Sequence, residues 1–191
     1  MGGRTGLAGW VDRLRYHELS RQALGLLLLP LCAWLAEPGP YRVIVGLTIA
    51  FIGQSWRIYA AGVIYKNRQL ATTGAYSLVR HPLYLGNFLI LAGFSLAGGK
   101  LLVLAAAAVF LMFYYPAAIR YEDHKLEQIF EDDWRSWSRR TPAMFPTRLN
   151  WLPDSGATWS ARQSLMRNGE LTISIYLTAC AGLLLFRAGM L

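Results

Sequence analysis

The polar stretch 74–87, GAYSLVRHPLYLGN, holds the residues of this chain that are best placed to do chemistry. His81 stands directly before Pro82, and a new apolar run follows at once. Proline is favoured at the first position of a helix, so the pattern predicts a helix that begins at Pro82 with His81 as its N-cap. The backbone N–H groups of Leu83 and Tyr84 would then lack helical partners. Free N–H groups at the positive end of a helix dipole predict an anion-binding site.

Three further polar side chains belong to the same feature. At helical spacing Arg80, Tyr84 and Asn87 share one face, so a guanidinium, a phenol and an amide converge beside the predicted anion site. The alternative is an ordinary loop followed by a helix that starts at proline and binds nothing.

A second polar cluster follows the apolar segment 101–119. This segment and the apolar run 83–97 are separated by only three residues and would form an antiparallel helical hairpin, in which the start of one helix lies beside the end of the other. We therefore expect His81 and Glu122 to be near each other, although they are far apart in sequence. The cluster comprises Glu122, Asp123, Arg120 and His124.

An anion site beside carboxylates suits a zwitterionic ligand, which carries both a carboxylate and an ammonium group. The aromatic rings of Tyr76 and Tyr84 would suit a flat base or an onium group.

The composition indicates a membrane protein. Of 191 residues, 54% are hydrophobic, and the mean hydropathy is +0.30, which is too apolar for an ordinary soluble domain. The net charge of +8 does not indicate nucleic-acid binding, because the basic residues flank apolar runs instead of lining one polar face. The two cysteines, Cys32 and Cys180, lie inside apolar segments and are expected to be buried without a disulfide or metal role.

The order of apolar and polar segments predicts an all-α polytopic membrane protein with about five transmembrane helices. The first apolar segment is short, the 98–100 turn closes the hairpin, and Pro116 is expected to kink the fourth segment. Two amphipathic helices are expected on the membrane surface, over 9–21 and 120–140. The five apolar segments are 23–36, 41–64, 83–97, 101–119 and 171–186.

The basic residues also predict the orientation. With a cytoplasmic N-terminus, most of the 19 Lys and Arg residues lie on the cytoplasmic side, together with both polar clusters. Gln54 and Arg57 lie inside the second apolar segment. Arg57 either extends to the membrane surface or faces a polar cavity, and both alternatives stay open.

The residues of both clusters resemble the integral-membrane superfamily of isoprenylcysteine carboxyl methyltransferases and phospholipid methyltransferases. GAYSLVRHPLYLGN is similar to its Gly-x-Tyr…Arg-His-Pro-x-Tyr-x-Gly signature. Glu122-Asp123-x-x-Leu126, followed by Phe130, spaced tryptophans and Thr141-Pro142, resembles its second block, which usually reads Glu-Glu-x-x-Leu and then Phe-Gly. The resemblance covers roughly residues 45–147. The chain departs from the pattern at Ala75, Ala118, Asp123 and Glu131-Asp132, where the superfamily often has Pro, Arg, Glu and Gly.

This resemblance implies a methyltransferase that uses S-adenosylmethionine and has its pocket at the cytoplasmic end of the hairpin. It implies a lipophilic small molecule or lipid as substrate, a membrane-embedded core over 45–147, and no metal. Residues 1–44 would hold an amphipathic helix and the first transmembrane helix, and 148–191 a connector and the last transmembrane helix. Glu122 and Arg120 are the expected catalytic residues, with Glu122 or His124 as the base for an ammonium substrate. The expected cofactor-binding residues are Gly74, Tyr76, Arg80, His81, Tyr84, Leu85, Gly86, Asn87, Glu122 and Asp123.

Two other functions fit parts of the sequence. Membrane sterol and steroid reductases have a similar Arg-His-x-x-Tyr block and use NADPH, although an acidic residue usually follows their Tyr-x-Gly where this chain has Asn87. A non-enzymatic membrane scaffold or small-molecule carrier would explain Gln54 and Arg57. The methyl acceptor stays open between a lipid amine, a prenylcysteine-like carboxylate, a thiol and another lipophilic alcohol or acid.

Overall fold

The computed structural model describes residues 29–30, 33–65, 68–147, 152 and 159–191, and these residues contain helices and no strand. The all-α prediction is therefore confirmed. The elements are α3 (Pro40–Val63), the short α4 (Ala75–Leu78), α5 (Pro82–Gly98), α6 (Leu101–Ser138), the π-helical turn η1 (Arg162–Arg167) and α7 (Glu170–Arg187).

Three of these helices, α3, α6 and α7, are long and apolar enough to cross a membrane, and α5 is a shorter apolar helix. They correspond to four of the five expected apolar segments, and the protein is an integral membrane protein. The first expected segment, 23–36, is described only in part, and the expected amphipathic helix 9–21 lies outside the described residues.

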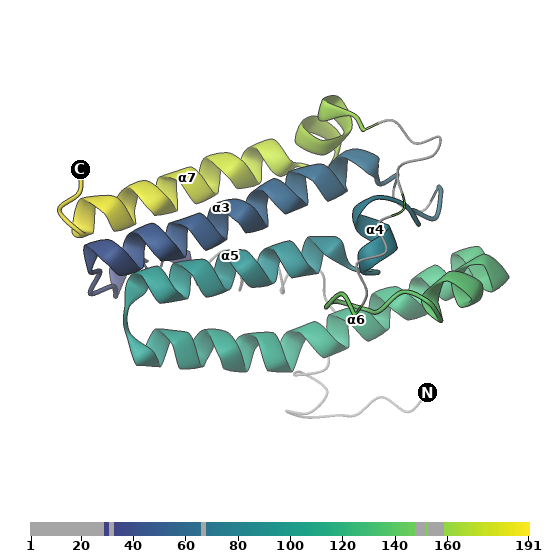
Figure 1. Ribbon diagram of the computed structural model, residues 1–191, viewed down its shortest axis with the longest axis horizontal. Helices are drawn as coiled ribbons and strands as arrows, with labels where there is room; N and C mark the ends of the chain where they lie inside the picture. The colour runs from purple at the N-terminus through teal and green to yellow at the C-terminus, as the bar shows by residue number, and fades with distance from the viewer. Residues whose placement is uncertain (1–28, 31–32, 66–67, 148–151, 153–158) are drawn as a thin grey trace, which may run out of the picture.

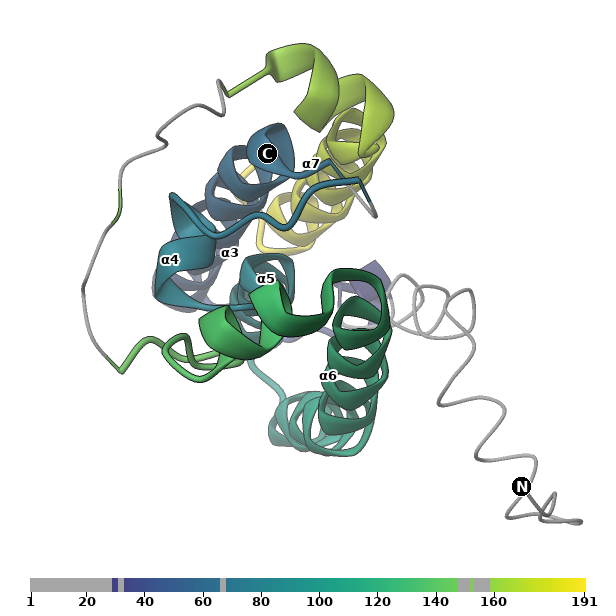
Figure 2. The ribbon, with the colours of Figure 1, turned by 90° about the vertical axis from the view of Figure 1, so that its right-hand side faces the viewer.

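The four long helices run side by side in the order α7, α3, α5, α6, and each is antiparallel to its neighbour (Figure 1). The C-terminal ends of α3 and α6 therefore meet the N-terminal ends of α5 and α7 at one end of the bundle. Viewed from that end, α4 and η1 also lie there (Figure 2). This end holds both polar clusters.

Glycines bring α3 and α5 into direct backbone contact. A Cβ atom added to Gly46 would meet the carbonyl oxygen of Gly93, and one added to Gly53 would meet the carbonyl oxygen of Gly86. Close approach through small residues is a common way for helices to pack in membranes, where apolar side chains gain little by leaving lipid. This contact fixes α5, and with it the start of the predicted site, against α3.

The hairpin is confirmed, and α6 differs from the expectation in one respect. Gly99 ends α5 in the left-handed conformation, with φ of 73°, and α6 begins two residues later. The amphipathic segment expected over 120–140 is the continuation of α6, which also contains Pro116. Glu131 has non-helical dihedrals, with φ of 44° and ψ of −113°, and marks a kink in this helix. Trp137 then packs into a cluster with Tyr76 of α4.

The C-terminal part packs on the core more closely than a connector would. Side chains of η1 and its flanks bind carbonyl groups in the last two turns of α3: Ser164 donates to Ile58 O at 2.7 Å, and Asn168 donates to Ala61 O at 2.7 Å. On α7, Leu177 and Cys180 enter the main apolar core, so Cys180 is buried as expected. Cys32 lies outside the described residues.

Candidate functional site

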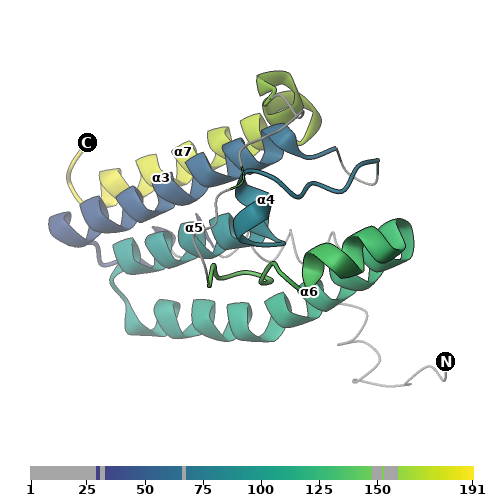
Figure 3. The same cartoon turned by 45° about the vertical axis from the view of Figure 1, so that its right-hand side comes forward.

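The candidate site lies at the end of the bundle where α4, the first turns of α5 and the charged half of α6 meet. Figure 3 shows α4 beside the start of α5, with the second half of α6 and the segment after it close by. The apolar part of α6, 101–119, is long enough to cross a membrane, so the acidic residues that follow lie beyond it.

Asp123 joins the two blocks that the sequence predicts to meet. Its carboxylate accepts hydrogen bonds from Arg80 at 2.7 Å and 3.3 Å, one to each oxygen, and lies 2.8 Å from His81 Nε2. His81 is buried, with 5% of its surface exposed. The predicted proximity of the start of α5 to the carboxylates after the hairpin is therefore confirmed.

These partners control the ionisation of Asp123. Burial alone would raise its pKa, but the hydrogen bonds and positive charges of His81 and Arg80 hold the pKa of Asp123 below its usual value. The carboxylate is thus held in its charged form at neutral pH.

Arg80 also ties down the segment that follows α6. Its Nη1 donates to the carbonyl oxygens of Thr141 at 2.8 Å and Ser138 at 3.2 Å, and its guanidinium carbon lies 5.9 Å from the centre of the Trp134 ring. The backbone N–H of His81 donates to Ala143 O at 3.0 Å. Arg80 and His81 therefore hold residues 138–143 over the start of α5.

Tyr84 and Glu122 form the second link between the blocks. The Tyr84 hydroxyl donates to a Glu122 carboxylate oxygen at 2.8 Å. The Tyr84 ring stacks on His81 and tilts against Tyr115, with both pairs of ring centres 5.5 Å apart. A carboxylate beside three aromatic rings offers one place where a cationic group would be stabilised.

The structure corrects the expected anion site at the first turn of α5. His81 is the N-cap residue and Pro82 starts the helix, as predicted, but the Tyr84 N–H donates to His81 O at 3.0 Å. The Tyr84 N–H is therefore not free, because the first turn is tightened by this three-residue hydrogen bond. The Arg80 and His81 side chains also both contact the Asp123 carboxylate.

Buried polar atoms without partners surround the site. Within the described residues, the hydroxyl of Tyr76 and the indole N–H groups of Trp134 and Trp137 are buried and make no hydrogen bond. All three side chains belong to one apolar cluster between α3, α4 and the end of α6. Burial, reinforced by the negative charge of Glu122, raises the pKa of Tyr76 well above its usual value, so the hydroxyl keeps its proton and can donate it in a hydrogen bond.

Three of the remaining predicted residues are placed as follows. Gly74 is the N-cap of α4, with φ of 56°, a conformation that favours glycine. Gly86 faces α3, where an added Cβ would meet Arg57 and the backbone of Gly53. Leu85 is half-buried, and its N–H donates to His81 O.

The other two, Asn87 and Arg120, lie away from the Tyr84–Glu122 contact. The Asn87 side chain accepts a hydrogen bond from Arg57. Arg120 is exposed and stands two positions before Glu122, a spacing that places the two side chains on different faces of the helix. The catalytic role of Arg120 stays a prediction.

Sequence reasoning missed Glu170. This residue is 1% exposed and forms a bidentate ion pair with Arg57, which is 7% exposed. The pair decides between the two alternatives for Arg57, since the guanidinium faces the protein interior. A lone acidic residue at the first position of an apolar helix was the available signal.

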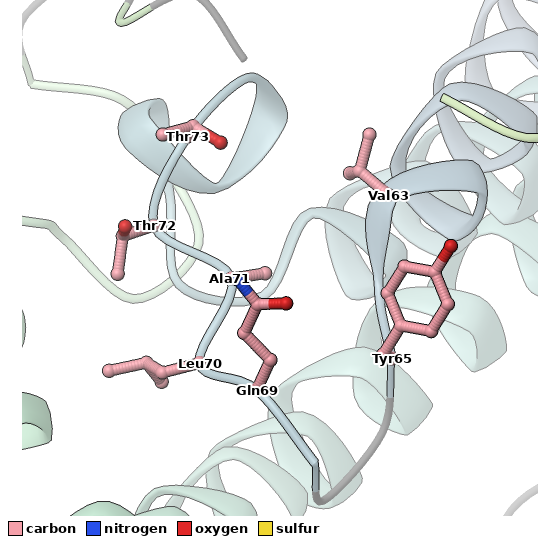
Figure 4. Close-up of a pocket in the computed structure, with 7 residues that line it drawn as sticks. All are labelled: Val63, Tyr65, Gln69, Leu70, Ala71, Thr72 and Thr73. Carbon is pink, nitrogen blue, oxygen red and sulfur yellow. The ribbon is translucent and has the colours of Figure 1, made fainter. Parts of the chain in front are cut away.

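A cavity of about 160 Å³ opens beside the aromatic cluster, between the end of α3 and the loop before α4 (Figure 4). It is smaller than most sites for drug-sized ligands, which take up roughly 300–1,000 Å³. No predicted site residue lines it. The lining residues are Val63, Tyr65, Gln69, Leu70, Ala71, Thr72 and Thr73.

Comparison with known proteins shows the family. A family model described as phospholipid methyltransferase matches residues 21–133, which include Arg80, His81, Glu122 and Asp123. The chain belongs to the phospholipid methyltransferase family. The match ends before Trp134 and Glu170, so these two residues lie outside the family region.

Two curated relatives are similar to this chain. It is 40% identical over 103 residues to the nickel-cobalt-cadmium resistance protein NccN of Alcaligenes xylosoxydans xylosoxydans. These residues make up 53% of this chain and 47% of that protein. It is 40% identical over 126 residues to the cobalt-zinc-cadmium resistance protein CzcN of Cupriavidus metallidurans. These residues make up 65% of this chain and 56% of that protein. The chain thus spans about half the length of these relatives. No solved structure matches it.

Proposed function

We propose that this protein transfers a methyl group from S-adenosylmethionine to a lipophilic or membrane-embedded acceptor at the cytoplasmic face of the membrane. Membership of the phospholipid methyltransferase family supports the reaction class, and the apolar helices support an acceptor that arrives from the bilayer. The excess of Lys and Arg in the segments at this end supports the cytoplasmic face.

One observation carries the proposal. The two polar blocks of the family region meet through two separate contacts, Arg80 and His81 with Asp123, and Tyr84 with Glu122. A scaffold protein would not need two buried or half-buried charged contacts at the same end of a helical hairpin. A cluster of ionisable groups that shift one another's pKa values is typical of functional sites.

The residues at this end fit the cofactor. The buried hydroxyl of Tyr76 and the indole N–H groups of Trp134 and Trp137 are donors without acceptors, and a nucleoside offers ring nitrogens and hydroxyl oxygens as acceptors. The carboxylate of Glu122 would accept from the amino group or ribose of the cofactor. Arg80 and His81 would act through Asp123, whose carboxylate they bind.

S-adenosylmethionine supplies an electrophilic methyl group on a sulfonium. In-line transfer of such a group depends on positioning and on exclusion of water more than on an acid or a metal. Here Tyr84 holds the Glu122 carboxylate in place, and residues 138–143 cover the start of α5. Where the acceptor is an ammonium group, Glu122 is the group of this site that would take its proton.

The acceptor class stays open between a lipid amine, a prenylcysteine-like carboxylate and a thiol. The names of the two relatives associate them with resistance to metal ions. Among the residues that the structure describes, no group of three or more His, Cys, Asp or Glu side chains is arranged to hold a metal ion.

Calorimetric titration of the detergent-solubilised protein tests the proposal. S-adenosylhomocysteine should bind with micromolar affinity, binding should be lost in His81→Ala and Glu122→Ala, and NADPH should not bind. Binding of NADPH would support a reductase instead, and binding of neither molecule would contradict a cofactor-dependent enzyme of either class.

A further inference from the structure

A buried ion pair connects the last helix to the candidate site. Glu170 is the first residue of α7 and is fully enclosed, and Arg57 binds both of its oxygens, at 2.6 Å through Nη2 and at 3.2 Å through Nε. Gln54 donates to the same carboxylate at 3.1 Å and to Ser174 at 2.9 Å. The carboxylate therefore fixes two polar side chains of α3 at once.

The remaining side of the Arg57 guanidinium reaches α5. Its Nη1 donates to the side-chain oxygen of Asn87 and, at 3.4 Å, to the carbonyl oxygen of Leu83. The aliphatic part of Arg57 crosses α5 at Gly86, where any Cβ would overlap it. Arg57 thus contacts the first two turns of α5 at three successive points.

These turns carry Tyr84, which binds Glu122. Leu83 directly precedes Tyr84, and Asn87 lies one turn later on the same helix. The Tyr84 ring also contacts Tyr115 of α6. A set of contacts therefore runs from Glu170 through Arg57 to the first two turns of α5, which carry the Tyr84–Glu122 pair.

We propose that Glu170 is a positioning residue for methyl transfer: by holding Arg57, it sets the first two turns of α5 and so the placement of Tyr84 against Glu122. This inference rests on the proposed function. It makes α7, which lies outside the family region, part of the working unit.

If the Arg57–Glu170 pair only stabilised the fold, its removal would affect stability and not the placement of Tyr84. A buried ion pair is a weak source of stability, because desolvation of both charges offsets their attraction. Replacement of both partners by apolar residues is often neutral for stability, whereas removal of one partner leaves an uncompensated buried charge. Stability and positioning can therefore be separated by comparing single and double variants.

The experiment compares wild type with Glu170→Gln, the double variant Arg57→Met/Glu170→Leu, and the control Thr178→Ala. Thr178 is an exposed α7 residue whose hydroxyl donates to Ser174 O of the same helix. The readouts are the unfolding temperature, the rate of methyl transfer from S-adenosylmethionine into lipid vesicles, and the ¹⁹F resonance of Tyr84 in fluorotyrosine-labelled protein. Tyr84→Phe assigns that resonance.

We expect the double variant to regain the unfolding temperature of wild type but to transfer methyl groups roughly ten- to hundredfold more slowly, with a shifted Tyr84 resonance. Thr178→Ala should match wild type in all three readouts. A double variant with wild-type stability, rate and Tyr84 resonance would overturn the inference.

Failure of the proposed function gives a different result. If wild type transfers no methyl groups and binds no S-adenosylhomocysteine, the proposed methyl transfer is wrong. The Tyr84 resonance then still tests whether the ion pair sets the position of Tyr84 against Glu122. An unchanged resonance in the double variant would then overturn the positioning role, and a shifted one would support it.

Discussion

The hydroxyl of Tyr84 donates a hydrogen bond of 2.8 Å to the carboxylate of Glu122, across 38 residues of sequence. The contact exists because Gly99 closes a tight hairpin and α6 continues as one helix beyond its apolar part. One turn before Tyr84, Arg80 and His81 bind the adjacent carboxylate, Asp123. The hairpin thus places Asp123 against Arg80 and His81, just before α5, and Glu122 against Tyr84, in the first turn of α5.

Glu131 occupies a backbone conformation that a glycine adopts more easily. Its φ of 44° lies in the left-handed region, and the superfamily pattern usually has Gly after the Phe of its second block. We expect Glu131→Gly to stabilise the protein by about 1 kcal/mol, because strain of this kind costs about 1–3 kcal/mol and glycine removes it at the cost of some chain entropy. Thermal unfolding in detergent measures the change.

The matched control for Glu131→Gly is Lys125→Gly, in the exposed helical part of α6. It should destabilise the protein by about 1 kcal/mol, since glycine is a poor helix former. Equal destabilisation by both variants would contradict the strained conformation of Glu131.

Gly86 should tolerate no side chain. A Cβ there would meet Arg57 and the carbonyl oxygen of Gly53, so we expect Gly86→Ala to cost about 1–3 kcal/mol through overpacking. Gly182 is the control, because a Cβ at that helical position meets nothing within 4 Å. Gly182→Ala should stabilise by up to about 1 kcal/mol, and a loss similar to that of Gly86→Ala would contradict the close contact of α3 and α5.

The variant Tyr76→Phe distinguishes a binding role of the Tyr76 hydroxyl from a packing role of its ring. Its buried hydroxyl has no hydrogen-bond partner among the described residues, so Tyr76→Phe should leave the unfolding temperature unchanged or raise it slightly. If the hydroxyl binds the cofactor, the same variant should weaken S-adenosylhomocysteine binding about five- to tenfold. Tyr41→Phe, at an exposed position at the other end of α3, should change neither quantity. Unchanged affinity in Tyr76→Phe would remove Tyr76 from the pocket.

Asp123 should make the stability depend on pH in the acid range. Its pKa is lower in the folded protein than in the unfolded chain, so its stabilising contribution is present above the unfolded pKa of about 4 and is lost as the pH falls through the folded value. At neutral pH, Asp123→Asn should cost about 2 kcal/mol, because bonds to Arg80 and His81 lose their charge. The difference from wild type should shrink below about pH 4 in thermal unfolding, whereas a constant difference would contradict the charged contact.

The sequence predicted the helices at the site end of the bundle better than it predicted which side chains contact one another there. Pro82 after His81 defined the start of α5, and the spacing of apolar runs defined the hairpin, because both depend on local preferences. The partners of Arg57 depend on how distant helices pack. No local pattern indicates that Glu170, more than a hundred residues later, lies beside it.

The expected anion site shows a second limit of prediction from the sequence. The sequence predicted the positive groups at the start of α5 but not how the protein would use them. Arg80 and His81 bind Asp123, and the Tyr84 N–H binds its own turn. Glu131 shows a third limit, since no pattern in the sequence predicted its non-helical dihedrals.

Methyl transfer itself is the most direct test of the central claim. Purified protein in lipid vesicles would be incubated with S-adenosylmethionine that carries a radiolabelled methyl group, and label in the organic-soluble fraction would be counted. Wild type and the control Glu127→Gln, an exposed-face variant of the same helix, should both transfer label. Glu122→Gln should lower the rate by at least about a hundredfold. Label no higher than in empty vesicles, or a Glu122→Gln rate equal to that of wild type, would contradict methyl transfer at the Tyr84–Glu122 end of the bundle.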